Sequence, residues 1–415
     1  MEKFLIHGGR KLSGTLDVER AKNAVLPLLA GAILTDEEVV IKKCPKIFDV
    51  LNMIEILKKL GVDVKYQDDS LLINSKNLNS CHIPYSLGKE LRSSVFMLGA
   101  LLGREKKARL CYPGGCNIGL RPIDIHIEAF KKLGVKIQDE GGELCCSVKK
   151  IKGREIYLDF PSVGATENIM LLSVLGEGKT EIHNPAKEPE IVDLMNFLNS
   201  MGARIYGAGT SIILIEGVKK LHGTTYLPMP DRIEAGTYLI ASAITGGEIE
   251  LRGIKAKNIS SLIHKLCDNS CKITIKNDII YLKSGSVKNP FDFITAPYPG
   301  FPTDLQAQTM ALLCVSDGVS LITENIFETR FNHVSELIRM GADVSVKGRT
   351  AMVRGVKRLC GADVYAKDLR GGAALVLAGL VAEGVTTVNG VYHMERGYLN
   401  MDEKLRSLGA NVIRK

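Results

Sequence analysis

The chain has 415 residues, of which 45% are hydrophobic and 24% charged, a composition typical of a globular protein that is long enough for more than one domain. Its formal net charge of +8 fits either general solubility or acidic ligands, but the low aromatic content (6%, with no Trp) and the lack of a Lys/Arg run interleaved with aromatics argue against a nucleic-acid partner. The longest apolar runs, 24–34 and 373–382, are shorter than the roughly 20 residues that span a bilayer, so we expect no membrane partner.

A long repeat organises the chain. Polar or charged clusters open apolar stretches typical of buried helices at 21–24, 91–94, 162–165, 231–234, 302–305 and 368–371. An amphipathic segment follows each stretch and ends at a marker, which is Gly61, Gly134, Gly202, Ser270, Gly341 and Gly409 in turn. The markers lie 73, 68, 68, 71 and 68 residues apart. A fixed long period predicts one supersecondary unit used six times.

The pattern inside each repeat predicts two helices and short strands. The first helix is apolar all round, as in 25–34, 169–175, 238–244, 310–314 and 374–380, so we expect it to be buried. The second helix, as in 51–60 and 125–133, alternates apolar and charged residues and should turn one face outward. Strand-like runs include Val18, 156–158, 212–215 and 351–353. These elements predict an α/β fold of two inside-out α/β barrels, each built from three repeats, with a boundary near 228–230.

The charged residues then lie at the starts of buried helices, where unpaired N–H groups and the helix dipole favour anions. Lys22, Arg92, Asp231, Asp304 and Arg370 hold such positions, and we expect a ligand cleft between the two domains to gather them. Asp is a good N-cap and needs no function there, whereas the dipole repels Lys and Arg. The cations therefore favour a functional interpretation.

The segment 112–122, Tyr-Pro-Gly-Gly-Cys-Asn-Ile-Gly-Leu-Arg-Pro, is the strongest local motif. Its Pro-Gly-Gly turn presents Cys116 on a loop with Arg121 nearby, and a neighbouring cation lowers the pKa of a thiol and makes it reactive. No cysteine spacing matches a structural zinc site, and residues 173–180 miss the geometry of a P-loop, so we predict neither.

A rigid proline-rich segment, 295–304, delivers Asp304 to a helix start. Its carboxylate is either a helix cap or, in a ligand site, a base that takes a proton from a substrate hydroxyl. Arg330, Arg370 and Arg396 lie at predicted strand or helix ends, and guanidinium groups bind carboxylates and phosphates. Any one of them could be a surface ion pair, but several at equivalent places fit a polyanionic substrate better.

Together these motifs resemble the UDP-N-acetylglucosamine enolpyruvyl transferase (UDP-N-acetylglucosamine 1-carboxyvinyltransferase) family over the whole chain. The matching segments are 21–24, 113–124, 162–167, 187–193, 230–234, 301–308, 323–331, 368–370 and 396–398. The resemblance implies two inside-out barrels, 22–229 and 1–21 plus 230–415, with the active site between them. It also implies transfer of enolpyruvyl from phosphoenolpyruvate to the 3′-hydroxyl of UDP-N-acetylglucosamine with release of phosphate, at the start of bacterial peptidoglycan synthesis. No metal or organic cofactor is implied.

The resemblance also implies roles for individual residues. Cys116 is the acid and can add to phosphoenolpyruvate as a nucleophile, Asp304 is the base, and Lys22 and Arg396 complete the catalytic set. The substrate-binding positions implied are Lys22, Asn23, Arg92, Arg121, Pro122, Ile123, Asp124, Ile125, Ser162, Val163, Gly164, Asp304, Ile326, Arg330, Arg370 and Arg396. The expected partners are the two small-molecule substrates; the sequence leaves the oligomeric state open.

Some positions depart from the family pattern. Phe160 and Pro161 stand where some members carry a lysine, Tyr298 where histidine is frequent, and Arg20 where glycine is common. Two rivals are the sister family, 5-enolpyruvylshikimate-3-phosphate synthase, and a non-catalytic sensor of nucleotide sugar. The Cys116 loop argues against the first, and the presence of Lys22, Cys116 and Asp304 argues against the second. Scattered cysteines and the absence of a signal-peptide core at the start of the chain favour the cytoplasm.

Overall fold

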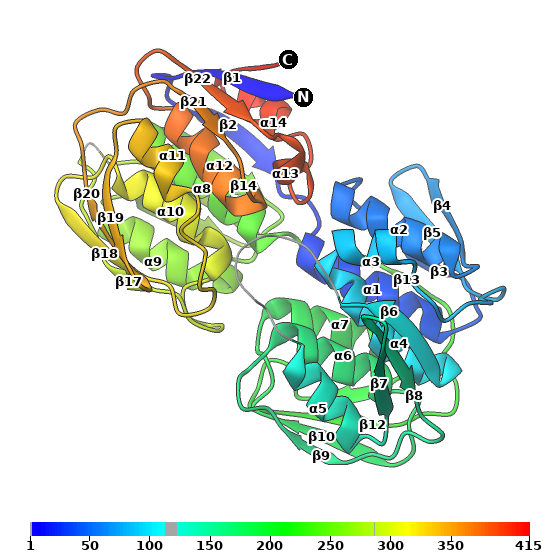
Figure 1. The fold of residues 1–415 in the computed structure, drawn as a ribbon. Coiled ribbons are helices and arrows are strands. Elements are labelled where there is room, and N and C mark those ends of the chain that lie inside the picture. Colours follow the sequence, from blue (N-terminus) through cyan, green and yellow to red (C-terminus); the bar gives the residue numbers. More distant parts are fainter. Residues whose placement is uncertain (1, 113–122, 286) are drawn as a thin grey trace. The chain divides into compact units, whose positions relative to one another are not determined.

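The computed structural model describes residues 2–112, 123–285 and 287–415, which form two compact units (Figure 1). We call the first the inserted unit; it runs from Arg20 to Met229. The second, the terminal unit, combines the segment through Glu19 with Pro230–Lys415 and so contains both ends of the chain.

In the inserted unit, the described helices divide into buried and outward-facing ones, as the sequence predicts. The buried helices are α1 (Lys22–Gly31), α4 (Phe96–Glu105) and α6 (Val163–Ser173), extended by the 3-10 turns η1 (Ala32–Leu34) and η2 (Arg92–Val95). The others are α2 (Phe48–Lys59), α3 (Tyr85–Glu90), α5 (Asp124–Lys132) and α7 (Pro189–Ser200). The strands are β3 (Val39–Ile41), β4 (Asp63–Gln67), β5 (Ser70–Asn74), β6 (Lys107–Cys111), β7 (Lys136–Glu140), β8 (Glu143–Ser147), β9 (Glu155–Tyr157), β10 (Lys179–His183), β11 (Arg204–Tyr206), β12 (Ile212–Glu216) and β13 (Thr224–Tyr226).

The terminal unit repeats this plan. Its buried helices are α8 (Arg232–Thr245), α10 (Gln306–Leu313) and α12 (Leu369–Gly379). Its other helices are η3 (Ala256–Ile259), α9 (Ser260–Asp268), η4 (Thr303–Leu305), α11 (Val334–Arg339), α13 (Tyr392–Glu395) and α14 (Met401–Ser407). Its strands are β1 (Lys3–His7), β2 (Ser13–Asp17), β14 (Glu248–Arg252), β15 (Lys272–Lys276), β16 (Ile279–Lys283), β17 (Phe293–Ile294), β18 (Val319–Thr323), β19 (Asp343–Lys347), β20 (Thr350–Arg354), β21 (Asp363–Tyr365), β22 (Val385–Asn389) and β23 (Asn411–Arg414).

The repeat is visible in the strand pairing. In the order β13-β3-β5-β4, a parallel pair is followed by an antiparallel hairpin, and β9-β10-β12-β11, β2-β14-β16-β15 and β17-β18-β20-β19 follow the same rule. In the order β21-β22-β1-β23, the N-terminal strand β1 occupies the third position, which β5, β12, β16 and β20 occupy in the other sheets. The sheet β6-β8-β7 has an isolated parallel bridge, His82 to Arg109, in place of the parallel partner strand.

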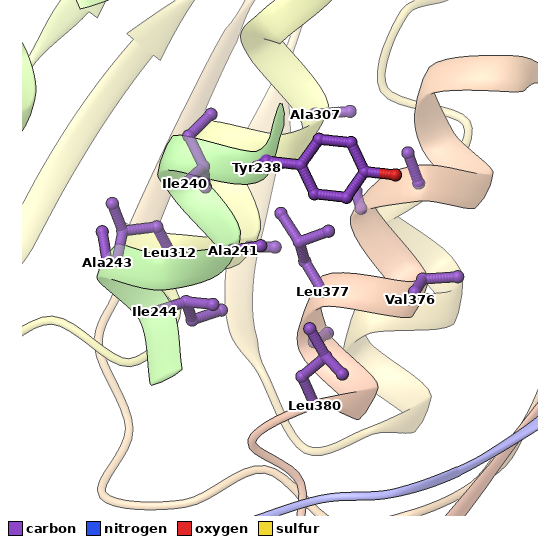
Figure 2. Packing of buried hydrophobic residues seen from close by; sticks show 14 of the residues in the cluster. Tyr238, Ile240, Ala241, Ala243, Ile244, Ala307, Leu312, Val376, Leu377 and Leu380 are labelled. Atoms are coloured by element: carbon purple, nitrogen blue, oxygen red, sulfur yellow. The ribbon is translucent and has the colours of Figure 1, made fainter. Parts of the chain in front are cut away.

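Each unit therefore has buried helices inside and half-buried strands outside, which confirms the predicted fold class. The described strands stay in separate sheets, and none of these closes into a continuous barrel. Figure 2 shows the core of the terminal unit, where Tyr238 and Ile240 of α8 pack with Leu312 of α10 and Leu377 of α12. Helices as apolar as these are stable only in such surroundings. Two details differ from the expectation: the clusters at 91–94 and 302–305 open as 3-10 turns, and Val18 follows β2 outside the strand.

The six repeat markers share one backbone conformation. Gly61, Gly134, Gly202, Gly341 and Gly409 have φ values of 89°, 91°, 96°, 91° and 95°. Ser270 adopts the same left-handed region with φ of 75°, although its side chain disfavours it. The repeat geometry thus overrides the local preference of a serine.

We expect Ser270→Gly to increase the free energy of unfolding by about 1 kcal/mol, because glycine enters the left-handed region without the steric cost of a Cβ. The gain is partly offset because Asn289 Nδ2 donates a 2.8 Å bond to Ser270 Oγ on the surface. The reciprocal change, Gly341→Ser, is the matched control, since a Cβ there meets no heavy atom within 4 Å and would add only backbone strain. Chemical denaturation should give shifts of opposite sign; shifts of the same sign would contradict the repeat argument.

Candidate active site

A guanidinium–carboxylate cluster, formed by Asp304, Arg330 and Arg370, lies in the terminal unit. Arg330 Nη2 donates to Asp304 Oδ1 at 2.7 Å, and Arg370 Nη2 donates to Asp304 Oδ2 at 2.9 Å. Both arginine side chains are 3% exposed, whereas that of Asp304 is 25% exposed. Asp304 is therefore the most accessible member of the cluster, and the two arginines that bind its carboxylate are buried.

Helix starts hold the cluster in place. Asp304 lies in η4, just before α10, and Arg370 lies in the first turn of α12, where Asp368 Oδ1 accepts from the backbone N–H of Arg370 at 3.0 Å. The Arg370 guanidinium also lies 5.3 Å from the ring centroid of Tyr398, a cation–π contact. Gln308 Nε2 donates to the Asp304 carbonyl at 2.9 Å and to Tyr398 Oη at 3.1 Å, which links α10 to the aromatic side chain.

A second carboxylate organises the segments beside the cluster. Glu324 is fully buried, and its Oε2 accepts from Thr303 Oγ1 at 2.9 Å, next to Asp304. Its Oε1 accepts from Thr295 Oγ1 and from the backbone N–H of Ile326, both at 2.8 Å. Glu324 thereby fixes the proline-rich segment and the Ile326 loop relative to each other.

Each of the two buried guanidinium groups has an N–H donor that is not used within the cluster. Arg330 Nε and Arg370 Nη1 have no hydrogen-bond partner among the residues that the structure describes. Burial disfavours the charge of Arg370, but Asp304, Tyr398 and Asp231 together outweigh it and raise the pKa of Arg370. Permanently charged donors of this kind suit an anionic ligand.

In the inserted unit, Lys22 begins α1, where no side chain caps the helix start. Its Nζ lies 2.9 Å from Oδ2 of the buried Asp49, which sits in the first turn of α2. The lysine side chain is only 13% exposed, so the carboxylate holds this cation at a helix start that would otherwise repel it. Asn23 follows on the same helix and is half-buried.

A second group in the inserted unit surrounds the start of α6. Ser162 caps this helix, because its Oγ accepts from the N–H of Ala165 at 3.3 Å. Val163 and Gly164 form the first turn, and the nearby α5 begins at Asp124. Burial lowers the pKa of His126 of α5, and the charge of Arg92 lowers it further. The remaining predicted positions of this group are Ile123, which is buried, and Ile125, which is half-buried.

The predicted site residues thus fall into groups. The structure brings Asp304, Arg330 and Arg370 together, with Ile326 tied to them through Glu324, and it brings Lys22 to Asp49. Arg396 follows α13 of the terminal unit and is half-buried. Cys116, Arg121 and Pro122 lie outside the described residues.

Sequence reasoning assigned no role to some residues around these groups, namely Asp49, His126, Asn168 and Gln308. Each is a buried polar residue in a helix. The sequence signal that could have found them is a polar residue on an otherwise apolar helix face. In the described ranges, no group of three or more His, Cys, Asp or Glu side chains is arranged to hold a metal ion. Across those same ranges, no helix combines the length and apolarity needed to cross a membrane.

The comparisons with known proteins agree with this arrangement. A family model described as EPSP synthase (3-phosphoshikimate 1-carboxyvinyltransferase) matches residues 6–405, which defines the chain as an enolpyruvyl transferase in the broad sense. Among solved structures, the enolpyruvyl transferase NikO from Streptomyces tendae superposes with a TM-score of 0.91 at 24% identity, over 100% of this chain and 99% of that one. EPSP synthase from Acinetobacter baumannii superposes with a TM-score of 0.78 at 17% identity, over 100% of each chain. These two likenesses concern the fold.

Sequence relatives narrow the class. UDP-N-acetylglucosamine 1-carboxyvinyltransferase 2 of Caldanaerobacter subterraneus subsp. tengcongensis is 50% identical over 415 residues, with 100% of both chains covered. The protein of the same name in Carboxydothermus hydrogenoformans is 48% identical, over 100% of this chain and 99% of its own. The chain belongs to the UDP-N-acetylglucosamine 1-carboxyvinyltransferase family.

Proposed function

We infer that this protein transfers the enolpyruvyl group of phosphoenolpyruvate to the 3′-hydroxyl of UDP-N-acetylglucosamine and releases phosphate. The observation that carries this conclusion is the 50% identity to a transferase of that name along the full length of both chains. The buried cations of both units support it, since both substrates are anionic.

The reaction has two halves. The sugar hydroxyl adds through its oxygen to C2 of phosphoenolpyruvate and loses its proton to a base, while an acid protonates C3 and turns it into a methyl group. The tetrahedral ketal that results then loses a proton from that methyl group and expels phosphate, which restores the double bond. The protein must therefore supply a base, an acid and cations for the phosphate and carboxylate.

We assign these roles as proposals. Asp304 is the base, because its carboxylate is the accessible part of a cluster whose guanidinium groups orient it. Cys116 is the acid and a nucleophile toward C2. Lys22, Arg121 and Arg396 bind the anionic groups of phosphoenolpyruvate, and Arg330 and Arg370 add donors beside Asp304.

The remaining predicted positions are assigned to the nucleotide sugar. They are Asn23, Arg92, Pro122, Ile123, Asp124, Ile125, Ser162, Val163, Gly164 and Ile326. The proposed domains are 22–229 and 1–21 plus 230–415, and both contribute residues that act on the same pair of substrates. We further propose that the reaction opens peptidoglycan precursor synthesis in the cytoplasm, where reduced cysteines such as those of this chain persist.

The test is phosphate release from phosphoenolpyruvate by the full-length protein, with UDP-N-acetylglucosamine or shikimate-3-phosphate as acceptor, each with and without fosfomycin. Release only with the nucleotide sugar, abolished by this epoxide, supports both the transfer and the reactive thiol. Release only with shikimate-3-phosphate would move the protein to the sister activity. Binding of the nucleotide sugar without any release would favour a sensor.

Cys116→Ser tests the thiol directly. We expect this variant to lose covalent labelling by fosfomycin while keeping part of the transfer activity, because a hydroxyl is a poorer nucleophile but still carries a proton. Mass spectrometry of the 112–122 segment measures the adduct, with Cys360→Ser, an exposed cysteine, as the control. Labelling of the Cys116→Ser protein at another residue would overturn the assignment.

A further inference from the structure

A buried hydrogen-bond chain in the inserted unit joins α4, α5 and α6 behind the proposed nucleotide-sugar residues. Asn168 of α6 is fully buried, and its Nδ2 lies 2.9 Å from Nδ1 of His126 of α5. The same Nδ2 donates to the Val95 carbonyl at 3.0 Å, while Asn168 Oδ1 accepts from the N–H of Gly99 at 2.9 Å. Gly99 is required here, because a Cβ would lie 2.6 Å from Asn168 Oδ1.

This chain determines the tautomer of His126. A backbone N–H can only donate and a backbone carbonyl can only accept. The Gly99 N–H therefore identifies the Asn168 oxygen, and the Val95 carbonyl identifies the Asn168 nitrogen. The amide nitrogen therefore donates to His126 Nδ1, which must be without a proton. The proton of the neutral ring is consequently on Nε2, and the outer edge of the ring is a hydrogen-bond donor.

That edge faces the first turn of α6. A Cβ built on Gly164 would lie 3.2 Å from His126 Cε1 and 3.3 Å from Nε2. His126 is 5% exposed, and its hydrogen bond to Asn168 is made by Nδ1, the ring nitrogen other than Nε2. The first N–H groups of α6 lie beside this edge, and the charge of the Arg92 guanidinium acts on His126. The helix-start N–H groups, the Nε2–H of His126 and the Arg92 charge are all features that suit a ligand rich in anionic acceptors.

We propose that Asn168 is a positioning residue that holds His126 as the Nε2–H tautomer, so that His126 donates a hydrogen bond to the diphosphate of the nucleotide sugar. This inference rests on the proposed function, because it assigns the diphosphate of the nucleotide sugar to the part of the inserted unit beside His126. Burial, and secondarily the charge of Arg92, lower the pKa of His126 to about 3. The ring is thus a neutral donor whose contribution does not change across neutral pH.

Binding of uridine diphosphate to the full-length protein, measured by calorimetry from pH 5.5 to 8.5, tests the proposal. His126→Phe keeps the ring volume without a donor and should weaken binding about 10- to 100-fold, the range for a hydrogen bond to a charged group. His126→Gln places an amide donor near Nε2 and should recover much of the loss. His183→Gln is the control, since His183 stacks on Tyr157 at 4.3 Å on the outer strands of the same unit and should change nothing.

Asn168→Asp gives a signature that a structural role would not produce. A carboxylate at this place accepts a proton from Nδ1, which leaves Nε2 of the neutral ring as an acceptor facing the diphosphate. It also raises the pKa of His126, so binding should weaken at pH 8.5 and recover as the ring becomes doubly protonated at lower pH. The unmodified protein should show no such dependence, and ¹⁵N imidazole spectra should place its His126 proton on Nε2.

Unchanged binding by His126→Phe, or a proton on Nδ1 in the unmodified protein, overturns the proposal. If Asn168→Asp fails to fold, the His126 pair and the spectra still decide. Failure of the proposed function is a separate outcome: no phosphate release by the unmodified protein would refute the transfer, whereas normal release together with unaltered His126→Phe binding would refute only the role of His126.

Discussion

Asp304→Asn is expected to lower the rate of phosphate release about 10³-fold, within the range that a general base contributes. The amide keeps the shape of the carboxylate but takes no proton from the sugar hydroxyl. It also turns one N–H₂ group toward Arg330 or Arg370, both of which donate to the present carboxylate. Steady-state phosphate release at saturating concentrations of both substrates measures the effect.

The matched control is Asp292→Asn in the same unit. Asp292 is exposed, and its Oδ1 accepts from the N–H of Leu321 at 2.7 Å, a bond that an asparagine oxygen also accepts. Its phosphate release should equal that of the unmodified protein. A rate for Asp304→Asn within about tenfold of the unmodified rate would remove Asp304 from the role of base, because the loss of a positioned base costs more than that.

The architecture was largely predictable because one period governs the chain. Gly61, Gly134 and the other markers indicate the same left-handed turn in each of the six repeats. The apolar stretches before them predict helices that are buried in the core of each unit. The details that escaped prediction depend on tertiary context. Examples are the 3-10 openings before α4 and α10 and the completion of the last sheet by β1, whose partners are remote in sequence.

Within the candidate site, only residues with a distinctive local sequence context could be predicted. Arg370 stands out as a cation at a helix start, and Asp304 follows a proline-rich segment, so both were found from the sequence. Asp49 and Asn168 were missed because each looks like an ordinary helix residue until the fold pairs it with Lys22 or His126. Pairing across helices is information that spacing along one chain does not contain.

Lys404→Met is expected to lower the free energy of unfolding by about 1–2 kcal/mol at pH 8, because Glu234 loses its charged partner and must take up a proton in the folded state instead. Glu234, in the first turn of α8, is 2% exposed, and its Oε1 accepts from Lys404 Nζ of α14 at 2.7 Å. Its Oε2 accepts from the N–H of Glu19 at 2.7 Å. One carboxyl group thus joins the N-terminal segment, a central helix and the C-terminal helix of the terminal unit.

The pH dependence of this loss follows from the direction of the pKa shift. Burial raises the pKa of Glu234 to about 7, against the lowering influence of Lys404. The folded state therefore retains a proton that the unfolded chain releases from about pH 4.5 upward, so the contribution of this group to stability falls as the pH rises toward 7. Removing Lys404 raises the folded pKa further and extends the fall, so the variant should lose less stability at pH 5 than at pH 8.

Chemical denaturation at both pH values, with two companion variants, separates the buried pair from general loss of charge. Glu234→Gln combined with Lys404→Met should recover much of the loss, because glutamine still accepts from Glu19 without a charge to bury. Lys283→Met removes a surface lysine 3.0 Å from Glu248 and should cost at most about 1 kcal/mol. Equal losses for Lys404→Met and Lys283→Met, or a loss independent of pH, would mean that water reaches Glu234 and that the three segments are held together by apolar packing instead.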